Sequence, residues 1–354
     1  MIMLYKNNCI LNIFFIACFL FSCSGQDNSF EKIINSANDV SCVEIPVDFL
    51  LGKPYQLKLQ DSLLLIADNI DGKALSIYDY KNSKLINHIL DMGQGPNEIL
   101  VPILLNNSKD RTGVASILQR QNGVYTEYQL SDLQRGVVNP IKKISFKNID
   151  RIIKINIGYI AEGEYNRGSI GLFNELGCLI CVKNIYPNYI NEIEHESDKY
   201  ILGQGHVEFN NEAAVFAFAS YFTGEIVFYK LLNNNINMIN YYNLDKTSAF
   251  ENRIKSNPQN LKIQKTDIEH STDIYSTLNC FYILYSGQKM EDKNRVKYSY
   301  ILRFSQQGKF ICSYRTNLKV NNFCVTEDDK KIYAIALSEK MEYVLVEINI
   351  DKFN

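Results

Sequence analysis

Short apolar strands that alternate with tight polar turns recur along most of the chain, and they constrain the fold more than any other feature. After residue 45, no long segment shows sustained helical periodicity, and runs rich in Ile, Val, Tyr and Phe are separated by clusters of Asn, Asp and Gly. Several runs consist of a strand, a turn and a second strand, as in ALSIYDYKNSKLINHIL and YILRFSQQGKFICSY. The pattern predicts an all-β protein.

One aromatic or apolar residue in the strand before each turn marks a repeat along the chain. These anchor residues are Tyr78, Tyr128, Phe173, Phe228, Phe304 and Ile348. They lie 44 to 76 residues apart, and four-stranded propeller blades repeat about every 40 to 50 residues. The longest interval contains a polar stretch at residues 245–270, which we interpret as a loop inserted before the fifth blade. Six anchors predict a six-bladed β-propeller with four-stranded antiparallel blades; two β-sandwiches are the alternative.

Two of the turns are closely similar in sequence. Residues 173–181 read F-x-x-x-G-x-L-I-C and residues 304–312 read F-x-x-x-G-x-F-I-C. Gly177 and Gly308 therefore stand where a turn can require a positive φ.

The two ends of the sequence predict closure of the ring. The last unit reaches Ile348 and the sequence ends at Asn354, so this unit lacks its outermost strand. A spare strand, SCVEIPV at residues 41–47, precedes the first complete unit. Pairing it with the last blade would remove exposed strand edges. We therefore expect a propeller domain over residues 41–354, closed by an N-terminal strand.

The N-terminal residues have the features of an export signal. An apolar run at residues 10–21, interrupted only by Asn12, is too short to span a bilayer but matches the apolar region of a signal peptide. It ends in L-F-S-C at residues 20–23, which resembles a bacterial lipobox. The resemblance implies a signal peptide at residues 1–22, a lipid anchor on Cys23 in the outer membrane of the cell envelope, and a tether over residues 23–40. A plain signal peptide with a chance cysteine is the alternative.

The balance of charges argues against nucleic acid as a partner. The chain has 37 Lys and Arg against 39 Asp and Glu, so no basic excess exists to bind nucleic acid.

Six cysteines follow Cys23, most of them in apolar runs such as NCFYIL and KFICSY. Buried thiols behave as small hydrophobic groups, and we expect them to be free, although six could form three disulfides in an exported protein.

One segment carries a family resemblance. Residues 62–102 read SLLLIADNIDGKALSIYDYKNSKLINHILDMGQGPNEILVP. This segment resembles the NHL-type and TolB-like six-bladed β-propellers, especially exported bacterial lipoproteins of that group. The matching residues are Ala67, Asp68, Tyr78, Gly93, Gly95, Pro96, Glu98 and Pro102. The resemblance implies the fold and an envelope location, but no single function, because the group includes binding modules, scaffolds and a few enzymes.

The glycine-rich part of that segment predicts a structural loop. A phosphate-binding loop requires a following helix whose N-terminus faces the anion, and here strands follow. We interpret Gly93, Gly95, Pro96 and Glu98 as a connector between blades, in which Glu98 caps backbone amides.

A histidine-containing pattern occurs twice. Residues 193–200 and 268–275 share I-E-H-x-x-D-x-Y and contain two of the four histidines. Each copy precedes a new blade, so we expect both on the face where strands enter the central channel, as for the Gly93 loop. The candidate ligand-binding residues are His195, Asp198, His270 and Asp273. Imidazoles and carboxylates there could converge on a divalent metal or a polar ligand; repeat ancestry without a site is the alternative.

The sequence contains no G-x-S-x-G elbow, no H-E-x-x-H and no P-loop. We therefore predict a lipid-anchored envelope propeller that acts as a ligand-binding or protein-scaffolding module for a protein, glycan or peptide, with no cofactor. The first alternative is a metal-dependent hydrolase or lyase that uses the two histidines and two aspartates. The second is a structural partner of an outer-membrane complex.

Overall fold

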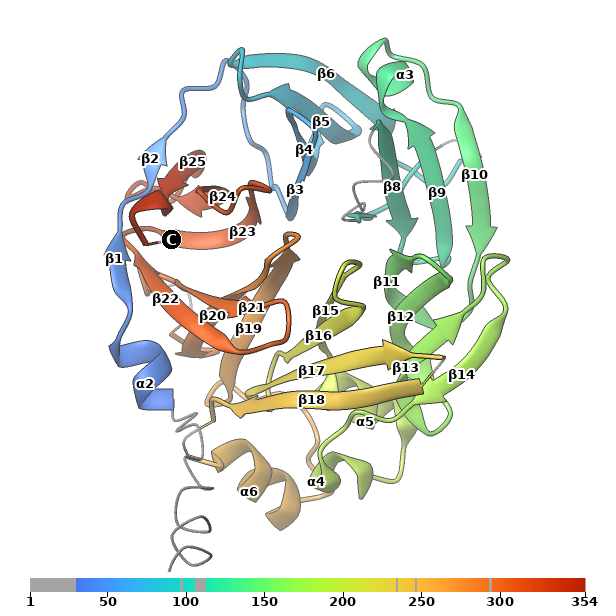
Figure 1. Ribbon diagram of the computed structural model, residues 1–354, viewed down its shortest axis with the longest axis vertical. Coiled ribbons are helices and arrows are strands. Elements are labelled where there is room, and N and C mark those ends of the chain that lie inside the picture. The colour runs from blue at the N-terminus through green and yellow to red at the C-terminus, as the bar shows by residue number, and fades with distance from the viewer. Residues whose placement is uncertain are drawn as a thin grey trace, which may run out of the picture.

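A computed structural model describes residues 30–95, 98–105, 113–233, 235–245, 247–292 and 295–353. The strands form six sheets arranged in a ring (Figure 1). Each sheet contains four antiparallel strands, and one sheet carries a fifth, parallel strand. The predicted six-bladed β-propeller is confirmed. The expected signal peptide and Cys23 lie outside the described residues.

The blades follow one another along the chain. Blade one comprises β3 (Gln56–Gln60), β4 (Leu63–Ile70), β5 (Lys73–Asp79) and β6 (Lys84–Asp91). Blade two comprises β7 (Pro102–Leu104), β8 (Val114–Gln119), β9 (Val124–Gln129) and β10 (Pro140–Ser145). Blade three comprises β11 (Ile149–Ile155), β12 (Gly158–Tyr165), β13 (Gly168–Phe173) and β14 (Leu179–Lys183). Blade four comprises β15 (Gly205–Asn210), β16 (Val215–Ser220), β17 (Glu225–Leu232) and β18 (Asn235–Asn243).

Blades five and six complete the ring. Blade five comprises β19 (Ile268–Ser276), β20 (Cys280–Lys289), β21 (Tyr300–Ser305) and β22 (Phe310–Thr316). Blade six comprises β23 (Lys319–Val325), β24 (Lys331–Leu337), β25 (Tyr343–Asn349) and β2 (Val43–Glu44). The short helices are α2 (Phe30–Asn35), α3 (Leu130–Gln134), α4 (Asn188–Asn191), α5 (Glu196–Gly203), α6 (Ala249–Ser256) and the 3-10 turn η2 (Asp351–Phe353).

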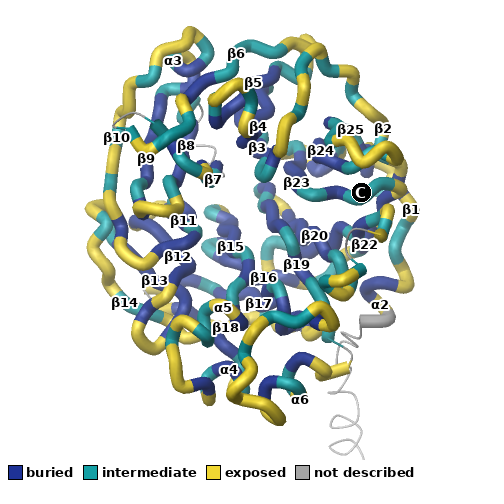
Figure 2. Tube along the Cα trace, turned by 180° about the vertical axis from the view of Figure 1, so that it is seen from behind, coloured by how far each residue is buried: buried dark blue, intermediate teal, exposed yellow. Residues whose placement is uncertain are grey.

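The first strand of each blade is innermost, because the first strands of neighbouring blades contact one another around the axis. All six anchor residues lie in the third strands of their blades, namely β5, β9, β13, β17, β21 and β25. Buried residues concentrate in the inner and middle strands, and exposed residues gather on the outermost strands and connectors (Figure 2). The anchors therefore repeat because each blade must bury one large side chain at the same place.

The N-terminal segment closes the ring as predicted. Strand β2 pairs antiparallel with β25, with Val43 opposite Glu347, and the Ile45 N–H donates to the Leu345 carbonyl at 2.8 Å. This pairing supplies the outermost strand that blade six lacks.

Residues 30–40, which we expected to belong to a tether, are instead folded onto the ring. Strand β1 (Asn38–Val40) pairs parallel with β22, on the rim of blade five. Ile33 of α2 is buried in the core between blades four and five, and Val40 is buried in the core that blade six shares. These apolar side chains explain why the segment packs rather than extends.

The connectors from the outermost strand of one blade to the innermost strand of the next share one face of the ring. They include the connectors between β6 and β7, between β14 and β15, and between β18 and β19. We call this the entrance face. The second connector contains α4 and α5, and the third, residues 245–270, contains α6 as well as loop. Ile190, Leu202, Phe250 and Ile254 from these helices form one buried cluster with Phe222 of blade four.

Turn glycines and cysteines match the sequence-based expectations in most respects. Gly177 and Gly308 have φ of +78° and +74°. The six cysteines from Cys42 onward form no disulfides with one another. Two are buried, but Cys178 is exposed because it lies in the turn before β14. Among the described residues, no helix is both long and apolar enough to cross a membrane.

Candidate functional site

All six innermost strands line a cavity of about 300 Å³ on the axis of the ring, here called the central pocket. Tyr55, Arg120 and Tyr221, from connectors and turns of the entrance face, also line it, so the pocket lies at that end of the axis. Its charged and polar side chains from the inner strands are Lys58, Arg151, His206, Glu208, Asp273 and Asn322.

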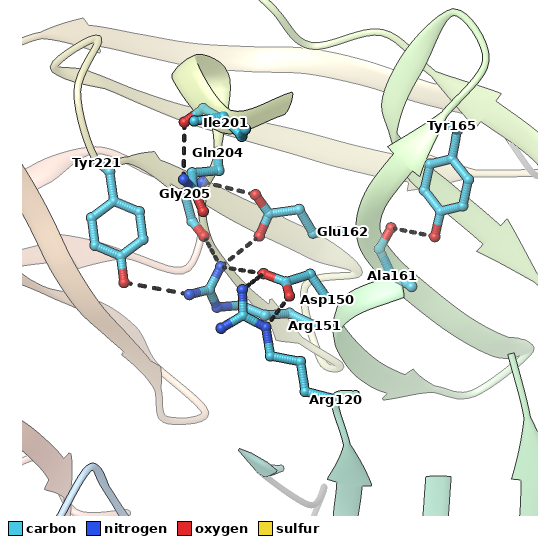
Figure 3. A network of polar contacts seen from close by, with 10 residues as sticks. All are labelled: Arg120, Asp150, Arg151, Ala161, Glu162, Tyr165, Ile201, Gln204, Gly205 and Tyr221. Atoms are coloured by element: carbon cyan, nitrogen blue, oxygen red, sulfur yellow. Dashed lines mark hydrogen bonds and ion pairs between the residues drawn. The ribbon is translucent and has the colours of Figure 1, made fainter. Parts of the chain in front are cut away.

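Arg151 is held by a buried network between blades three and four (Figure 3). Its Nη1 donates to Glu162 Oε2 at 3.1 Å and to the Gly205 carbonyl at 2.5 Å, and the Gly205 N–H donates to Glu162 Oε1 at 2.7 Å. Glu162 is fully buried, and burial raises the pKa of its carboxyl while the Arg151 charge opposes that rise. Because both partners are fixed by backbone contacts, Arg151 forms a rigid part of the pocket wall.

Arg120 joins blade two to blade three at the mouth of the pocket. Its Nη2 donates to Asp150 Oδ2 at 2.7 Å, and its Nε donates to the other oxygen (Figure 3). Its side chain is 44% exposed, in contrast to that of Arg151 at 17%. Arg120 is therefore the cation of this network that an incoming ligand can reach most directly.

A second buried ion pair crosses the axis of the ring and joins the opposite blades one and four. Lys58 Nζ lies 3.5 Å from Glu208 Oε2, and the ammonium group lies 5.0 Å from the centroid of the Tyr275 ring. Asp273 is also buried; its carboxylate accepts the Ile274 N–H at 2.9 Å and the Phe323 N–H at 3.3 Å. Burial raises the pKa of both Glu208 and Asp273, and Lys58 opposes the rise in each case.

His206 and Tyr55 each present a polar atom in the pocket wall that has no partner. His206 Nε2 and the Tyr55 hydroxyl are buried without a hydrogen bond in the structure. Burial lowers the pKa of His206 well below 6.5, and the nearby Arg151, Lys58 and Arg120 charges act in the same direction, so its imidazole is neutral. A buried polar atom without a partner destabilises the protein by about 1–3 kcal/mol. A ligand that hydrogen-bonds to these atoms would recover that energy.

The pocket is suited to hydrogen bonding rather than to metal binding. Within the described part of the chain, no group of three or more His, Cys, Asp or Glu side chains is placed to hold a metal ion. The three cations, Lys58, Arg120 and Arg151, are each paired with a carboxylate. The His206 ring lies 4.7 Å from the Tyr221 ring, which adds an aromatic surface.

The structure does not bring the four sequence-predicted ligand residues together. Asp273 lines the central pocket. His195 and Asp198 line a separate groove of about 1040 Å³ between α4, α5 and α6, here called the helix groove. His270 lines neither, because it is buried beside Tyr285, whose hydroxyl lies 3.4 Å from His270 Nδ1; burial lowers its pKa to about 4. The expected convergence on one metal or ligand is therefore not found.

The two copies of the histidine pattern differ because they adopt different secondary structures. In the first copy, His195 precedes α5, whose first turn contains Glu196 and Asp198; acidic residues there are stabilised by the helix dipole. In the second copy, the same pattern forms β19 and pairs with β20. Residues at matching pattern positions therefore point to different places.

The Gly93 loop connects β6 to β7 on the entrance face. The Gly95 N–H donates to Glu98 Oε2 at 2.7 Å, and Met92 forms a parallel bridge with Ile99. Pro96 lies outside the described residues. Glu98 therefore caps a backbone amide within the connector.

Most residues of the central pocket carry no local motif, and our sequence interpretation missed them. Lys58, Arg120, Arg151 and His206 come from four different blades. The available signal was a charged residue between apolar residues in an innermost strand, as Lys58 in QLKLQ and Arg151 in IDRIIKI.

Comparison with known proteins agrees with the fold. No curated protein matches this chain. A solved structure from Bacteroides fragilis, described as an exported protein, is 13% identical, covers 90% of this chain and 96% of its own, and superposes with a TM-score of 0.60. A DUF4221 family member from Bacteroides vulgatus is 11% identical, covers 88% and 98%, and has a TM-score of 0.54. At these identities, the likeness shows the fold alone.

The sequence profile of one family matches residues 29–328, which is most of the chain. That match agrees with the six blades and with the resemblance in residues 62–102. The chain belongs to the TolB-like 6-blade propeller-like family.

Proposed function

We propose that this protein is a lipid-anchored binding module of the bacterial cell envelope that holds a small polar ligand in the central pocket. The propeller fold supports a binding or scaffolding module in general. The observation that carries the proposal is the presence of His206 Nε2 and the Tyr55 hydroxyl, buried without partners, in the wall of a cavity that all six blades form.

The size and lining of the pocket favour a small ligand over a protein segment. Its volume of about 300 Å³ is at the lower end of the range for small-molecule sites, about 300–1,000 Å³. Apolar side chains such as Ile153 and Val207 stand among the polar groups, an arrangement that orients a ligand through specific hydrogen bonds.

The envelope location is supported by the lipobox at residues 20–23 and by the description of the Bacteroides fragilis protein of the same fold as exported. Two or three acyl chains attach a protein firmly to a membrane, because each buried CH₂ contributes about 0.8 kcal/mol.

The anchor is tested by fractionation of cells that express Cys23→Ala. We expect this variant to leave the membrane fraction, whereas the control Cys178→Ala, which removes an exposed thiol of the propeller, stays with the membranes. Unchanged fractionation of Cys23→Ala would remove the lipid anchor from the proposal.

The ligand site is tested by thermal shift of the detergent-solubilised full chain with a panel of neutral saccharides, dipeptides and small carboxylic acids. A ligand at 100 times its Kd adds about 2.7 kcal/mol to stability. We expect at least one compound to raise the Tm, and His206→Phe to abolish the shift. The matched control is His195→Phe in the helix groove, which should retain it. A shift that survives His206→Phe, or a panel that never raises the Tm, would contradict the central pocket as the site.

A further inference from the structure

A second hollow adjoins the central pocket over blade five. It has a volume of about 240 Å³. It lies on the entrance face, between the end of β20 and the beginnings of β21 and β23. Thr272 of β19 lines both spaces, and consecutive residues of β23 line one each: Asn321 the hollow and Asn322 the central pocket. The central pocket and this blade-five hollow are therefore neighbours that share part of their walls.

The lining of the blade-five hollow is rich in hydroxyl and amide groups. Thr272, Ser286, Gln288 and Asn321 supply side chains that can both donate and accept hydrogen bonds. Tyr298 adds an aromatic ring, and the Arg315 guanidinium carbon lies 4.4 Å from the centroid of that ring. The cation over one face restricts the ring to a defined orientation.

The charges of the two spaces favour a ligand without net charge. In the central pocket each cation is paired with a carboxylate, and the blade-five hollow contains one acidic and one basic side chain, Glu269 and Lys319. The partnerless atoms, His206 Nε2 and the Tyr55 hydroxyl, belong to neutral groups. An anion would therefore find no unpaired cation in the central pocket, and the Asp273 carboxylate already accepts backbone N–H groups. A molecule with many hydroxyl groups, in contrast, can satisfy donors and acceptors on all sides.

We propose that the ligand is a neutral oligosaccharide of at least two sugar units, with one unit in the central pocket and the next in the blade-five hollow. This inference rests on the proposed function and deepens it. Each space alone is small, so each suits one ring, and Thr272 lies where the linkage between the rings would pass. Each space is lined by an aromatic ring with an arginine over one face, Tyr221 in the first and Tyr298 in the second, and aromatic rings pack against the apolar faces of sugars.

Isothermal titration of the full chain with a length series tests this inference. The probes are neutral mono-, di- and trisaccharides of glucose, galactose, mannose and N-acetylglucosamine, with the corresponding uronic acids as charged controls. We expect one disaccharide to bind at least 10-fold more tightly than its monosaccharide, and its uronic acid analogue to bind more weakly.

Variants separate the two spaces. Ser286→Ala and Gln288→Ala, at residues that line the blade-five hollow alone, should reduce the disaccharide affinity to that of the monosaccharide without changing monosaccharide binding. The control is Gln307→Ala, in the exposed turn between β21 and β22 at the opposite end of the blade. His206→Phe should abolish binding of both lengths. Melting temperatures of all variants exclude unfolding as the cause.

The outcomes distinguish this inference from the proposed function. Equal affinity for both lengths, or a length dependence that Ser286→Ala and Gln288→Ala leave unchanged, would overturn the blade-five hollow as a subsite and leave the central pocket in place. Binding of a dipeptide or an acid, but of no saccharide, in a manner sensitive to His206→Phe would overturn the ligand class alone. If no probe binds, both are overturned.

Discussion

The Arg151 guanidinium and the Glu162 carboxylate lie 3.1 Å apart on adjacent strands of blade three, and both also bind the backbone of Gly205 at the start of blade four. One ion pair therefore positions a pocket residue and joins two blades. Removing one partner of a buried pair is strongly destabilising, because the remaining charge loses its compensation.

We accordingly expect Glu162→Gln to lower the free energy of unfolding by about 3 kcal/mol, the lower end of the usual range of about 3–5 kcal/mol, because Asp150 also lies 3.7 Å from Arg151. Urea denaturation measures the change. The matched control is Glu251→Gln, which breaks the more exposed pair with Lys255 on α6 and should change stability by less than about 0.5 kcal/mol. Equal effects of the two variants would show that burial of the first pair is not decisive.

Glu225 gives the protein a predictable pH dependence. Its carboxyl is buried, accepts the Tyr241 hydroxyl at 2.9 Å and the Thr223 hydroxyl at 3.3 Å, and burial raises its pKa from 4.5 to about 7. The folded state therefore holds the proton more tightly than the unfolded state, so this contribution to stability is complete below pH 4.5 and is lost as the pH rises through 7. The loss amounts to about 3 kcal/mol at about 1.4 kcal/mol per pKa unit.

Glu225→Gln should remove this contribution, and chemical denaturation of both proteins at several pH values isolates it as a difference. The comparison with Glu225→Gln is necessary because two buried histidines, His206 and His270, give stability an opposite pH dependence. Burial lowers their pKa values, so their contribution to the free energy of unfolding is lost as the pH falls below 6.5. A difference between the two proteins that does not change from pH 4.5 to pH 8 would contradict the raised pKa.

Two turn glycines with the same φ allow backbone strain and steric overlap to be separated. Gly72 and Gly308 both have φ of +74°. A Cβ at Gly72 would meet no atom within 4 Å, whereas a Cβ at Gly308 would overlap with Cγ of Phe228, an anchor residue. We expect Gly72→Ala to destabilise by about 1 kcal/mol and Gly308→Ala by a further 1–3 kcal/mol or so, measured by urea denaturation. Equal losses would mean that the Phe228 ring moves aside without strain.

The N-terminal strand that closes blade six should be necessary for stability of the whole ring. Ile45→Pro removes the N–H that donates to the Leu345 carbonyl, and the control Ile45→Ala retains it. We expect the proline variant, and a deletion of residues 40–48, to lower the Tm of the entire domain in one transition. An unchanged Tm in the deletion would show that the ring does not depend on this closure.

Repetition explains why the fold was predictable from sequence. Six blades must each bury a large residue in the third strand, so one such residue, for example Tyr78, Phe173 or Phe304, recurs in every blade and reveals the architecture. Closure followed from counting strands, because the last unit had three and the N-terminal segment offered one. The folded state of residues 30–40 was not recognised, because α2 and β1 are short and depend on contacts with distant parts of the ring.

The central pocket was not predictable in the same way. Arg120, Arg151 and His206 approach one another only because the ring places successive blades side by side, and no spacing along the chain records that proximity. A repeated local pattern was misleading for a related reason: the pattern I-E-H-x-x-D-x-Y forms a helix at residues 196–203 and a strand at residues 268–276, since the neighbouring strands and not the pattern determine the conformation.

The order of β1 and β2 along the chain has a mechanical consequence. A force applied upstream of α2 reaches the three residue pairs of β1 with β22 before it reaches β2. Strand β1 would therefore detach from blade five first and dissipate part of the applied force. The pairing of β2 with β25, which closes the ring, would bear no load until β1 has detached.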